Sequence, residues 1–404
     1  MNQKFTPFIL LLLCMLLIRC SVPQTTTPTS EPVLPTRSVE PSATRDEPTQ
    51  PPLKPTFTTT IEIPYLRMVD ENQGWGMRGI RGTKETVIRT QDGGLTWTKA
   101  NPPEPMTSGI SPQPFMIGFF LDPNHAWVRN SHSTRVWRTN DGGQTWDPSE
   151  LPDIEFFYPS EIFPDTIFFT DPEHGWLMFY LESGMSHQYV NLYYTTDGGA
   201  TWEKLVDPTG AGGLQGCCKT GMAFHGLQTG LVTYEQGPYT EPHVSWSHDG
   251  GRTWIYQSLP SPFIDPDDVQ NSYCTTHSPH LFSPEMVTLG VECRITSDWE
   301  DTYSFVYTSK DAGESWSTMP CPGHSIQFFT PTNGYSFGPD IYTTENSGQT
   351  WEFVSSNDWE AQFQFVDPQN GWAITQMEEE RILYQTTDGG RTWGLIEPRI
   401  IYSP

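Results

Sequence analysis

One eight-residue pattern, Ser/Thr-x-Asp-x-Gly-x-Thr/Ser-Trp, recurs seven times along the chain at intervals of 35 to 62 residues. It is clearest as TTDGGATW at residues 195–202 and as TTDGGRTW at residues 386–393. Its central positions are Asp92, Asp141, Asp197, Asp249, Asp311, Asn346 and Asp388. A pattern repeated at this spacing indicates a fold made of similar supersecondary units, each of which packs on its neighbours.

Each copy of the pattern, which we call the box, has the composition of a tight hairpin turn. Its glycines tolerate positive φ, and its central carboxylate can accept hydrogen bonds from the backbone of its own turn. An aliphatic residue stands five positions before each central residue: Val87, Val136, Leu192, Val244, Val306, Ile341 and Leu383. We therefore expect a strand to enter each box, a second strand to leave with its Trp, and the central carboxylates to be structural.

A second, weaker motif, Phe-x-Asp-x-x-x-Gly-Trp, precedes each box. It is clearest from Phe169 to Trp176 and from Phe365 to Trp372. Elsewhere Met68, Phe120, Phe224, Phe282 and Phe328 take the aromatic position, and Trp75, Trp127, Leu231, Leu289 and Tyr335 take the Trp position. The motif predicts a strand that ends at the Phe and another that begins at the Gly-Trp.

Together the two motifs predict seven units of four antiparallel strands, which is the pattern of an all-β, seven-bladed β-propeller over residues 57–404. An open solenoid is the alternative, but it would need atypical terminal repeats, and the last copy is among the best formed. Either 57–63 or 399–402 could supply an extra edge strand that fastens the ring. The sequence does not choose between them.

The residues before the repeats predict export. A basic Lys4 and an apolar run at 8–18 are typical of a signal segment over 1–20, since eleven apolar residues are too few to span a membrane. The stretch ending at Cys20 resembles a bacterial lipoprotein cleavage site, although Arg19 stands where a small residue is usual. Lipid attachment at Cys20, ordinary secretion and an uncleaved anchor stay open. Residues 21–56 are rich in Pro, Thr and Ser, which predicts a disordered stalk that tethers the protein to the cell envelope.

With both motifs in place, the chain resembles the Asp-box (bacterial neuraminidase repeat) propellers, and within them it is most similar to the photosystem II stability/assembly factor family. That resemblance implies a non-enzymatic chaperone that docks on a membrane-protein subunit through a basic patch. The arginines here are scattered and the formal net charge is −26, so the patch is missing. A general extracytoplasmic binding propeller fits better.

Enzymes with the same box offer the competing function. Sialidases carry an early Phe/Tyr-Arg-Ile-Pro segment, which the stretch from Ile63 to Met68 does not match. Xyloglucan hydrolases place their acid and base in a cleft between two propellers, and one ring cannot form that cleft. We therefore predict no catalytic residues, with a glycan-cleaving enzyme as the alternative.

No metal site is predicted. Two acidic loops, Asp265 to Asp268 and Asp298 to Asp301, offer the oxygen ligands that calcium prefers, but no EF-hand spacing is present. Calcium is therefore a weak candidate ligand and no other cofactor is expected.

Five cysteines beyond the signal segment fall between the fourth and sixth repeats: Cys217, Cys218, Cys274, Cys293 and Cys321. Export permits disulfides, and an odd number leaves one thiol unpaired. A bridge from Cys217 or Cys218 to Cys274 would join two neighbouring loops. The pairing itself cannot be deduced from the sequence.

The longest connections, 147–165, 203–220 and 255–278, are expected on the face opposite the boxes. That face carries the predicted binding aromatics Phe156, Phe157, Tyr158, Tyr239, Tyr273 and Trp299. A protein, peptide or glycan ligand would suit them, although packing of the loops is an equal interpretation. The acidic chain should repel nucleic acid, and we expect a monomer.

Overall fold

The computed structural model describes residues 57–78, 86–103, 116–154, 157, 166–184, 187–206, 213–235, 241–263, 268, 271–295, 298–357, 359–377 and 380–402. The chain divides after Leu53, and all the described residues belong to the second unit, Lys54–Pro404. The signal segment and the stalk lie outside the described residues. Among the residues that are described, no helix is long and apolar enough to cross a membrane.

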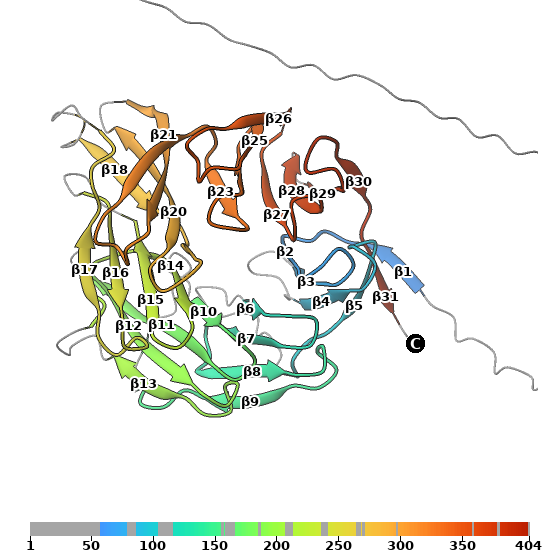
Figure 1. Ribbon diagram of the computed structural model, residues 1–404. Helices are drawn as coiled ribbons and strands as arrows, with labels where there is room; N and C mark the ends of the chain where they lie inside the picture. The colour runs from blue at the N-terminus through green and yellow to red at the C-terminus, as the bar shows by residue number, and fades with distance from the viewer. Residues whose placement is uncertain are drawn as a thin grey trace, which may run out of the picture. The chain divides into compact units, whose positions relative to one another are not determined.

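Seven sheets of the second unit, each with four antiparallel blade strands, form a ring, which confirms the seven-bladed β-propeller (Figure 1). The first three blades, in chain order, contain β2 (Tyr65–Met68), β3 (Gly74–Arg78), β4 (Thr86–Thr90) and β5 (Thr96–Lys99); β6 (Met116–Phe120), β7 (Ala126–Asn130), β8 (Arg135–Thr139) and β9 (Asp147–Glu150); and β10 (Thr166–Phe169), β11 (Gly175–Gly184), β12 (His187–Thr195) and β13 (Glu203–Val206).

The remaining blades follow the same order, with one additional short strand in blade 5. Blades 4 to 7 contain β14 (Lys219–His225), β15 (Thr229–Tyr234), β16 (His243–Ser247) and β17 (Ile255–Ser258); β18 (Ser272–Thr276), β19 (His280–Leu281), β20 (Val287–Ile295), β21 (Asp298–Ser309) and β22 (Ser317–Cys321); β23 (Ser325–Phe328), β24 (Gly334–Phe337), β25 (Asp340–Thr344) and β26 (Glu352–Ser356); and β27 (Ala361–Phe365), β28 (Gly371–Met377), β29 (Glu380–Thr386) and β30 (Gly394–Ile396).

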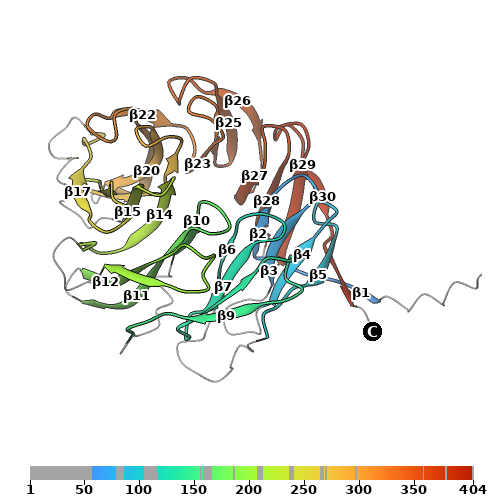
Figure 2. The same cartoon turned by 60° about the horizontal axis from the view of Figure 1, so that its bottom comes forward.

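Both candidate edge strands close the ring together. β31 (Arg399–Tyr402) pairs in parallel with β5, the outer strand of blade 1, and β1 (Phe57–Thr60) then pairs antiparallel with β31. Figure 2 shows these first and last strands together at the outer edge of blade 1. A six-stranded sheet built from both ends of the repeat region therefore joins blade 7 to blade 1.

The two sequence motifs meet at the same end of every blade. In each blade, an amide of the box turn donates to a carbonyl of the turn between the first two strands, as Gly198 N does to Glu173 O at 2.8 Å. The aliphatic residue before each box is buried in all seven blades, with at most 3% of its surface exposed. The glycine that opens the second strand leaves room for the motif aromatic, since a Cβ on Gly175 would lie 2.4 Å from the Phe169 ring.

Blade 5 departs from the expected alignment by one residue. Leu281 pairs with Val287, as Phe169 pairs with Gly175 in blade 3. Leu281 and Thr288 therefore occupy the positions that the sequence motif assigned to Phe282 and Leu289, and that assignment was wrong. Adjacent apolar residues at 281 and 282 made the two registers indistinguishable in the sequence.

The motif Trp fastens each regular blade to the next. The indole Nε1 of Trp127 donates to Gly198 O at 2.7 Å, that of Trp176 to Gly250 O at 2.9 Å, and that of Trp372 to Gly93 O at 2.9 Å. In blade 4, where Leu231 replaces the Trp, the Gln257 side chain accepts from Trp246 Nε1 and donates to Gly313 O of blade 5. A different residue thus restores the same connection.

Candidate functional site

The box carboxylates accept hydrogen bonds from residues of their own turns. Asp388 accepts from the Thr392 hydroxyl at 2.7 Å, the Thr392 amide at 2.9 Å and the Thr386 hydroxyl at 2.8 Å. These hydrogen bonds lower the pKa of Asp388 to about 2. In blade 6 the Asn346 side chain makes the equivalent contacts as an amide. A carboxylate that an amide can replace in this way holds the turn and has no need to transfer protons.

The opposite ends of the blades form a second face, which we call the loop face. It carries the connections that enter each blade and the hairpin between the second and third strands. Those hairpins are longest in blade 3, where β11 and β12 reach to Gly184 and His187, and in blade 5, where β20 and β21 reach to Ile295 and Asp298. Blade 4 thus lies between two extended hairpins on this face.

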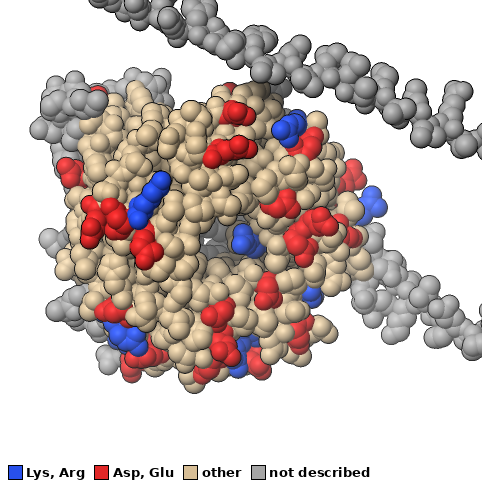
Figure 3. Space-filling model, in the orientation of Figure 1, with Lys and Arg blue, Asp and Glu red and all other residues tan. Residues whose placement is uncertain are grey.

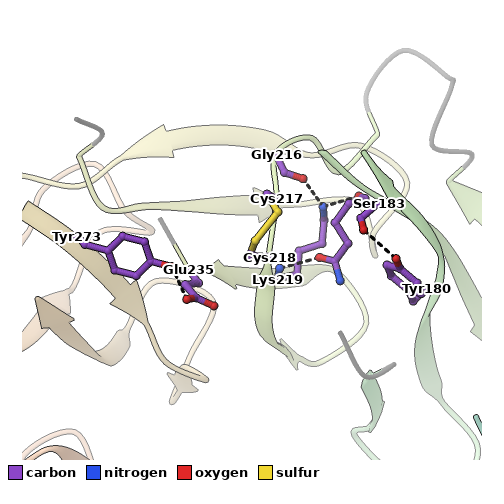
Figure 4. The surroundings of a disulfide bond; sticks show 9 residues. Tyr180, Ser183, Gly216, Cys217, Cys218, Lys219, Glu235 and Tyr273 are labelled. Carbon is purple, nitrogen blue, oxygen red and sulfur yellow. Dashed lines mark hydrogen bonds between the residues drawn. A yellow bond between two sulfur atoms is a disulfide. The ribbon is translucent and has the colours of Figure 1, made fainter. Parts of the chain in front are cut away.

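A disulfide between the adjacent residues Cys217 and Cys218 lies where the chain enters blade 4 (Figure 4). Both cysteines are half-buried, and Cys218 has a φ of 62°. The left-handed region that this angle represents is costly for a residue with a Cβ. The disulfide therefore holds a turn that an unlinked chain would rarely adopt.

The next residue, Lys219, has a side chain that is almost completely buried, with 6% of its surface exposed. Its Nζ donates to Gly216 O at 2.9 Å and to Gln188 O of blade 3 at 3.0 Å, and it lies 5.5 Å from the Tyr234 ring. Burial lowers the pKa of this ammonium to about 7. A buried amine held by carbonyls depends on the exact position of the turn that provides them.

Glu235, the residue directly after β15, links the same turn to blade 5. Its amide donates to Cys218 O at 2.8 Å, and its carboxylate accepts from the Tyr273 hydroxyl of β18. Burial, with the neighbouring carboxylate, raises the pKa of Tyr273 to about 12. Figure 4 shows this pair on one side of the disulfide, with Tyr180 and Ser183 of the blade 3 hairpin on the other. Blades 3, 4 and 5 therefore meet at one turn.

Of the predicted binding aromatics, the structure brings Tyr273 into this cluster. Phe157 instead packs on Phe179 with ring centroids 5.1 Å apart, as part of the core between blades 2 and 3, so packing is its observed role. Phe156, Tyr158 and Tyr239 lie outside the described residues, and so does the side chain of Trp299. The connections are also shorter than expected, because 147–150 form β9, 203–206 form β13 and 255–258 form β17.

The cysteines pair differently from the suggested bridge between loops. Cys217 pairs with Cys218, and Cys274 pairs with Cys293 across β18 and β20 in the blade 5 core, where both are fully buried. Cys321 is the unpaired thiol among the five. Cys274 lies in a strand with its side chain toward the core, so it could not reach a loop on the surface.

Within the described ranges, no group of three or more His, Cys, Asp or Glu residues could hold a metal ion. The side chains of Asp265, Asp267, Asp298, Glu300 and Asp301, which formed the calcium candidates, lie outside those ranges. Figure 3 shows one face of the ring with Asp and Glu side chains distributed around a central hollow, as the net charge of −26 leads one to expect.

Sequence reasoning missed Gln188, Lys219 and Glu235. A lysine is among the residues least often buried, so nothing marked Lys219 as an interior residue. Its position directly after two adjacent cysteines was the one available signal.

The Sortilin-Vps10 family model, described as sortilin and neurotensin receptor 3, matches residues 85–212, about a third of the chain. No curated protein matches the chain. Among solved structures, YCF48 bound to D1 peptide is 17% identical with a TM-score of 0.49, covering 83% of this chain and 98% of that chain.

YCF48 from Cyanidioschyzon merolae is 15% identical with a TM-score of 0.47, covering 82% of this chain and 98% of that one. A structure from a study of two prolyl endopeptidases is 12% identical with a TM-score of 0.51, covering 85% of this chain and 51% of that chain. At these identities the likeness is one of fold.

Proposed function

We propose that this chain, a seven-bladed β-propeller built on Asp-box repeats, is a non-enzymatic binding protein that takes a protein, peptide or glycan ligand on the loop face over blades 3 to 5. The observation that carries the proposal is the asymmetry of this face. Two extended hairpins flank blade 4, and the disulfide turn, Lys219 and the Glu235–Tyr273 pair lie between them. The repeated carboxylates, in contrast, serve their own turns.

The hairpin ends supply the exposed groups for a test. Glu182 in β11 and Arg294 in β20 are both exposed, so their substitution should leave the fold intact. We expect Glu182→Lys and Arg294→Glu to abolish binding on peptide and glycan arrays. Glu345→Lys, at an exposed position of the blade 6 box, is the matched control and should bind as the unsubstituted chain does. Equal binding by all three variants would place the ligand elsewhere.

A glycan-cleaving enzyme is the alternative. It predicts release of reducing ends or chromophore from a panel of glycosides and polysaccharides, whereas a binding protein retains these ligands unchanged. Turnover that survives repeated purification would overturn the proposal.

We propose further that the protein works outside the cytoplasm, tethered to the cell envelope through its N-terminal segment. The signal-like run at 8–18 and the two disulfides support this location, because disulfides persist in oxidising compartments. Lipid attachment at Cys20 predicts an acyl-modified peptide in mass spectrometry and its loss in Cys20→Ala. Recovery of the unmodified chain from the medium would favour plain secretion.

A further inference from the structure

The turn that contains Cys217 and Cys218 differs from the other left-handed positions in the ring. Four described residues other than glycine have positive φ: Asp153, Cys218, Ala312 and Ser347. Ala312 and Ser347 stand in boxes, at the position that glycine holds in the other copies. The turns at Ala312 and Ser347 keep the hydrogen bonds that recur in all seven boxes. Cys218, in contrast, is held by a covalent bond to its neighbour.

This turn is the point where three blades are tied. Gly216 O accepts from Gln188 N at 3.2 Å and from Lys219 Nζ at 2.9 Å, and Lys219 N donates to the Gln188 side chain at 2.7 Å. On its other side Cys218 O accepts from Glu235 N, and Glu235 receives the Tyr273 hydroxyl of blade 5. A change of backbone conformation at Cys218 would therefore displace contacts to blades 3 and 5 at once.

Lys219 makes that displacement consequential. Its buried ammonium donates to the carbonyls of Gly216 and Gln188, and a buried charge that loses an acceptor either becomes neutral or moves to water. A movement of the turn that withdraws Gly216 O leaves Gln188 O as the remaining carbonyl acceptor of Lys219, so the side chain loses part of what holds it in the interior.

The two disulfides differ in their access to reductants. Cys217 and Cys218 are half-buried, whereas Cys274 and Cys293 have no exposed surface. Thiol–disulfide exchange requires a thiolate to reach a sulfur atom, so access decides which bond is reduced first. The buried bond thus provides an internal control within the same chain.

We propose that the Cys217–Cys218 disulfide is a redox latch of the loop face: it holds the closed turn when oxidised, and its reduction by a dithiol opens the surface over blades 3 to 5. One thiolate of the dithiol attacks a sulfur of the pair to give a mixed disulfide, and the second thiol then displaces it. The protein gains two electrons and two protons as two thiols, and the reductant becomes a disulfide. The further expectation that opening this surface releases a bound ligand rests on the proposed function, whereas the conformational change itself does not.

The test is graded reduction of the full chain with dithiothreitol, followed by alkylation and mass spectrometry, with hydrogen exchange measured in parallel. We expect Cys217 and Cys218 to be alkylated while Cys274 and Cys293 stay protected. Amides at Gln188, Lys219 and Glu235 should then exchange on the order of tenfold faster. Simultaneous reduction of both disulfides, or selective reduction with unchanged exchange, overturns the latch.

Two variants separate the covalent bond from the backbone conformation that it holds. Cys217→Ser with Cys218→Ser should exchange like the reduced chain. Cys217→Ser with Cys218→Gly should exchange like the oxidised chain and ignore the reductant, because glycine adopts a φ of 62° without a disulfide. Fast exchange in the glycine variant would mean that the left-handed turn is not what the disulfide maintains.

These readouts need no ligand, so the two proposals fail separately. If reduction changes exchange but array binding is unaffected by the Glu182 and Arg294 substitutions, the binding face is wrong and the latch stands. If those substitutions abolish binding and reduction changes nothing, the latch is wrong and the binding face stands.

Discussion

Blades 7, 1, 2 and 3, which we call the regular arc, and blades 4, 5 and 6, the irregular arc, reach the same ring by different means. In the regular arc an Asp such as Asp171 caps the first turn, accepting from the amides of Glu173 and His174, and an indole fastens the blade to its neighbour. In the irregular arc Ser283 and Thr330 cap that turn in blades 5 and 6, and Tyr335 replaces the Trp.

The arcs also differ in their cores. Buried apolar clusters described in the structure lie between every neighbouring pair of blades except 5 and 6. Both disulfides belong to the irregular arc, one at the entry to blade 4 and one inside blade 5. The comparison teaches that covalent bonds and individual side chains support the ring where the repeated motif has been lost, and that the same arc carries the candidate site.

The largest effect should come from the buried disulfide of the irregular arc. Cys274→Ala with Cys293→Ala should lower the free energy of unfolding by about 3 kcal/mol, because the bond closes a loop between residues 19 apart and both sulfurs are in the core. Guanidinium denaturation measures the change. The matched control is Cys217→Ala with Cys218→Ala, whose separation of one residue leaves almost no loop to restrict. Equal losses in the two variants would contradict this account.

A box in the regular arc should be the next most sensitive position. Asp197→Ala removes acceptors for the Thr195 hydroxyl, the Thr201 amide and the Thr201 hydroxyl, and should cost about 2 kcal/mol of unfolding free energy. Asp197→Asn should cost less than half as much, since Asn346 makes the same contacts in blade 6. Thermal and chemical denaturation would show whether the amide is the milder change.

Lys219 should give the irregular arc a distinct pH dependence. Its folded pKa of about 7 lies below the ordinary lysine value of 10.5, so between these values the unfolded chain binds more protons. Stability contributed through this residue therefore rises with pH across that window, by at most about 1.4 kcal/mol per pH unit. The difference between the unsubstituted chain and Lys219→Met isolates it. A difference that is independent of pH from 7 to 10 would show that the lysine titrates normally.

The smallest effects should be those of the connections between blades. Trp127→Phe removes the indole donor to Gly198 O while keeping the aromatic packing, and should cost about 1 kcal/mol. Gln257→Leu, which removes the substitute connection in the irregular arc, should cost a similar amount. Hydrogen exchange resolved by blade would locate each loss, and a negligible effect at Gln257 would mean that the buried cluster between blades 4 and 5 holds them together without this connection.

The fold was predictable because each repeat contains the residues that specify its turns. The box at 195–202 and the Gly175-Trp176 pair specify two turns at one end of a blade, and seven copies specify a ring. The blade 5 register was not predictable, since Leu281 and Phe282 fit equally well. Ring closure was predicted only in part. The sequence offered 57–63 and 399–402 as alternative edge strands, whereas in the structure both segments join the sheet of blade 1.

The contacts of the candidate site were not predictable from the sequence. Tyr273 was one of the predicted aromatics, but its partner Glu235 comes from the neighbouring blade, at a distance in sequence that no local pattern reveals. The burial of Lys219 could not be predicted because its acceptors are backbone carbonyls. Every residue has such a carbonyl, so the sequence does not mark which ones lie near the lysine.

The insertion of β31 between β5 and β1 also governs the order of events as the chain is made. The edge of blade 1 contains residues from positions near 60, near 97 and near 400. Synthesis can deliver blades 2 to 7 one after another, but the sheet of blade 1 is complete only when residues 399–402 have been made. Pairing between residues so far apart in sequence is slow, so we expect this sheet to form last.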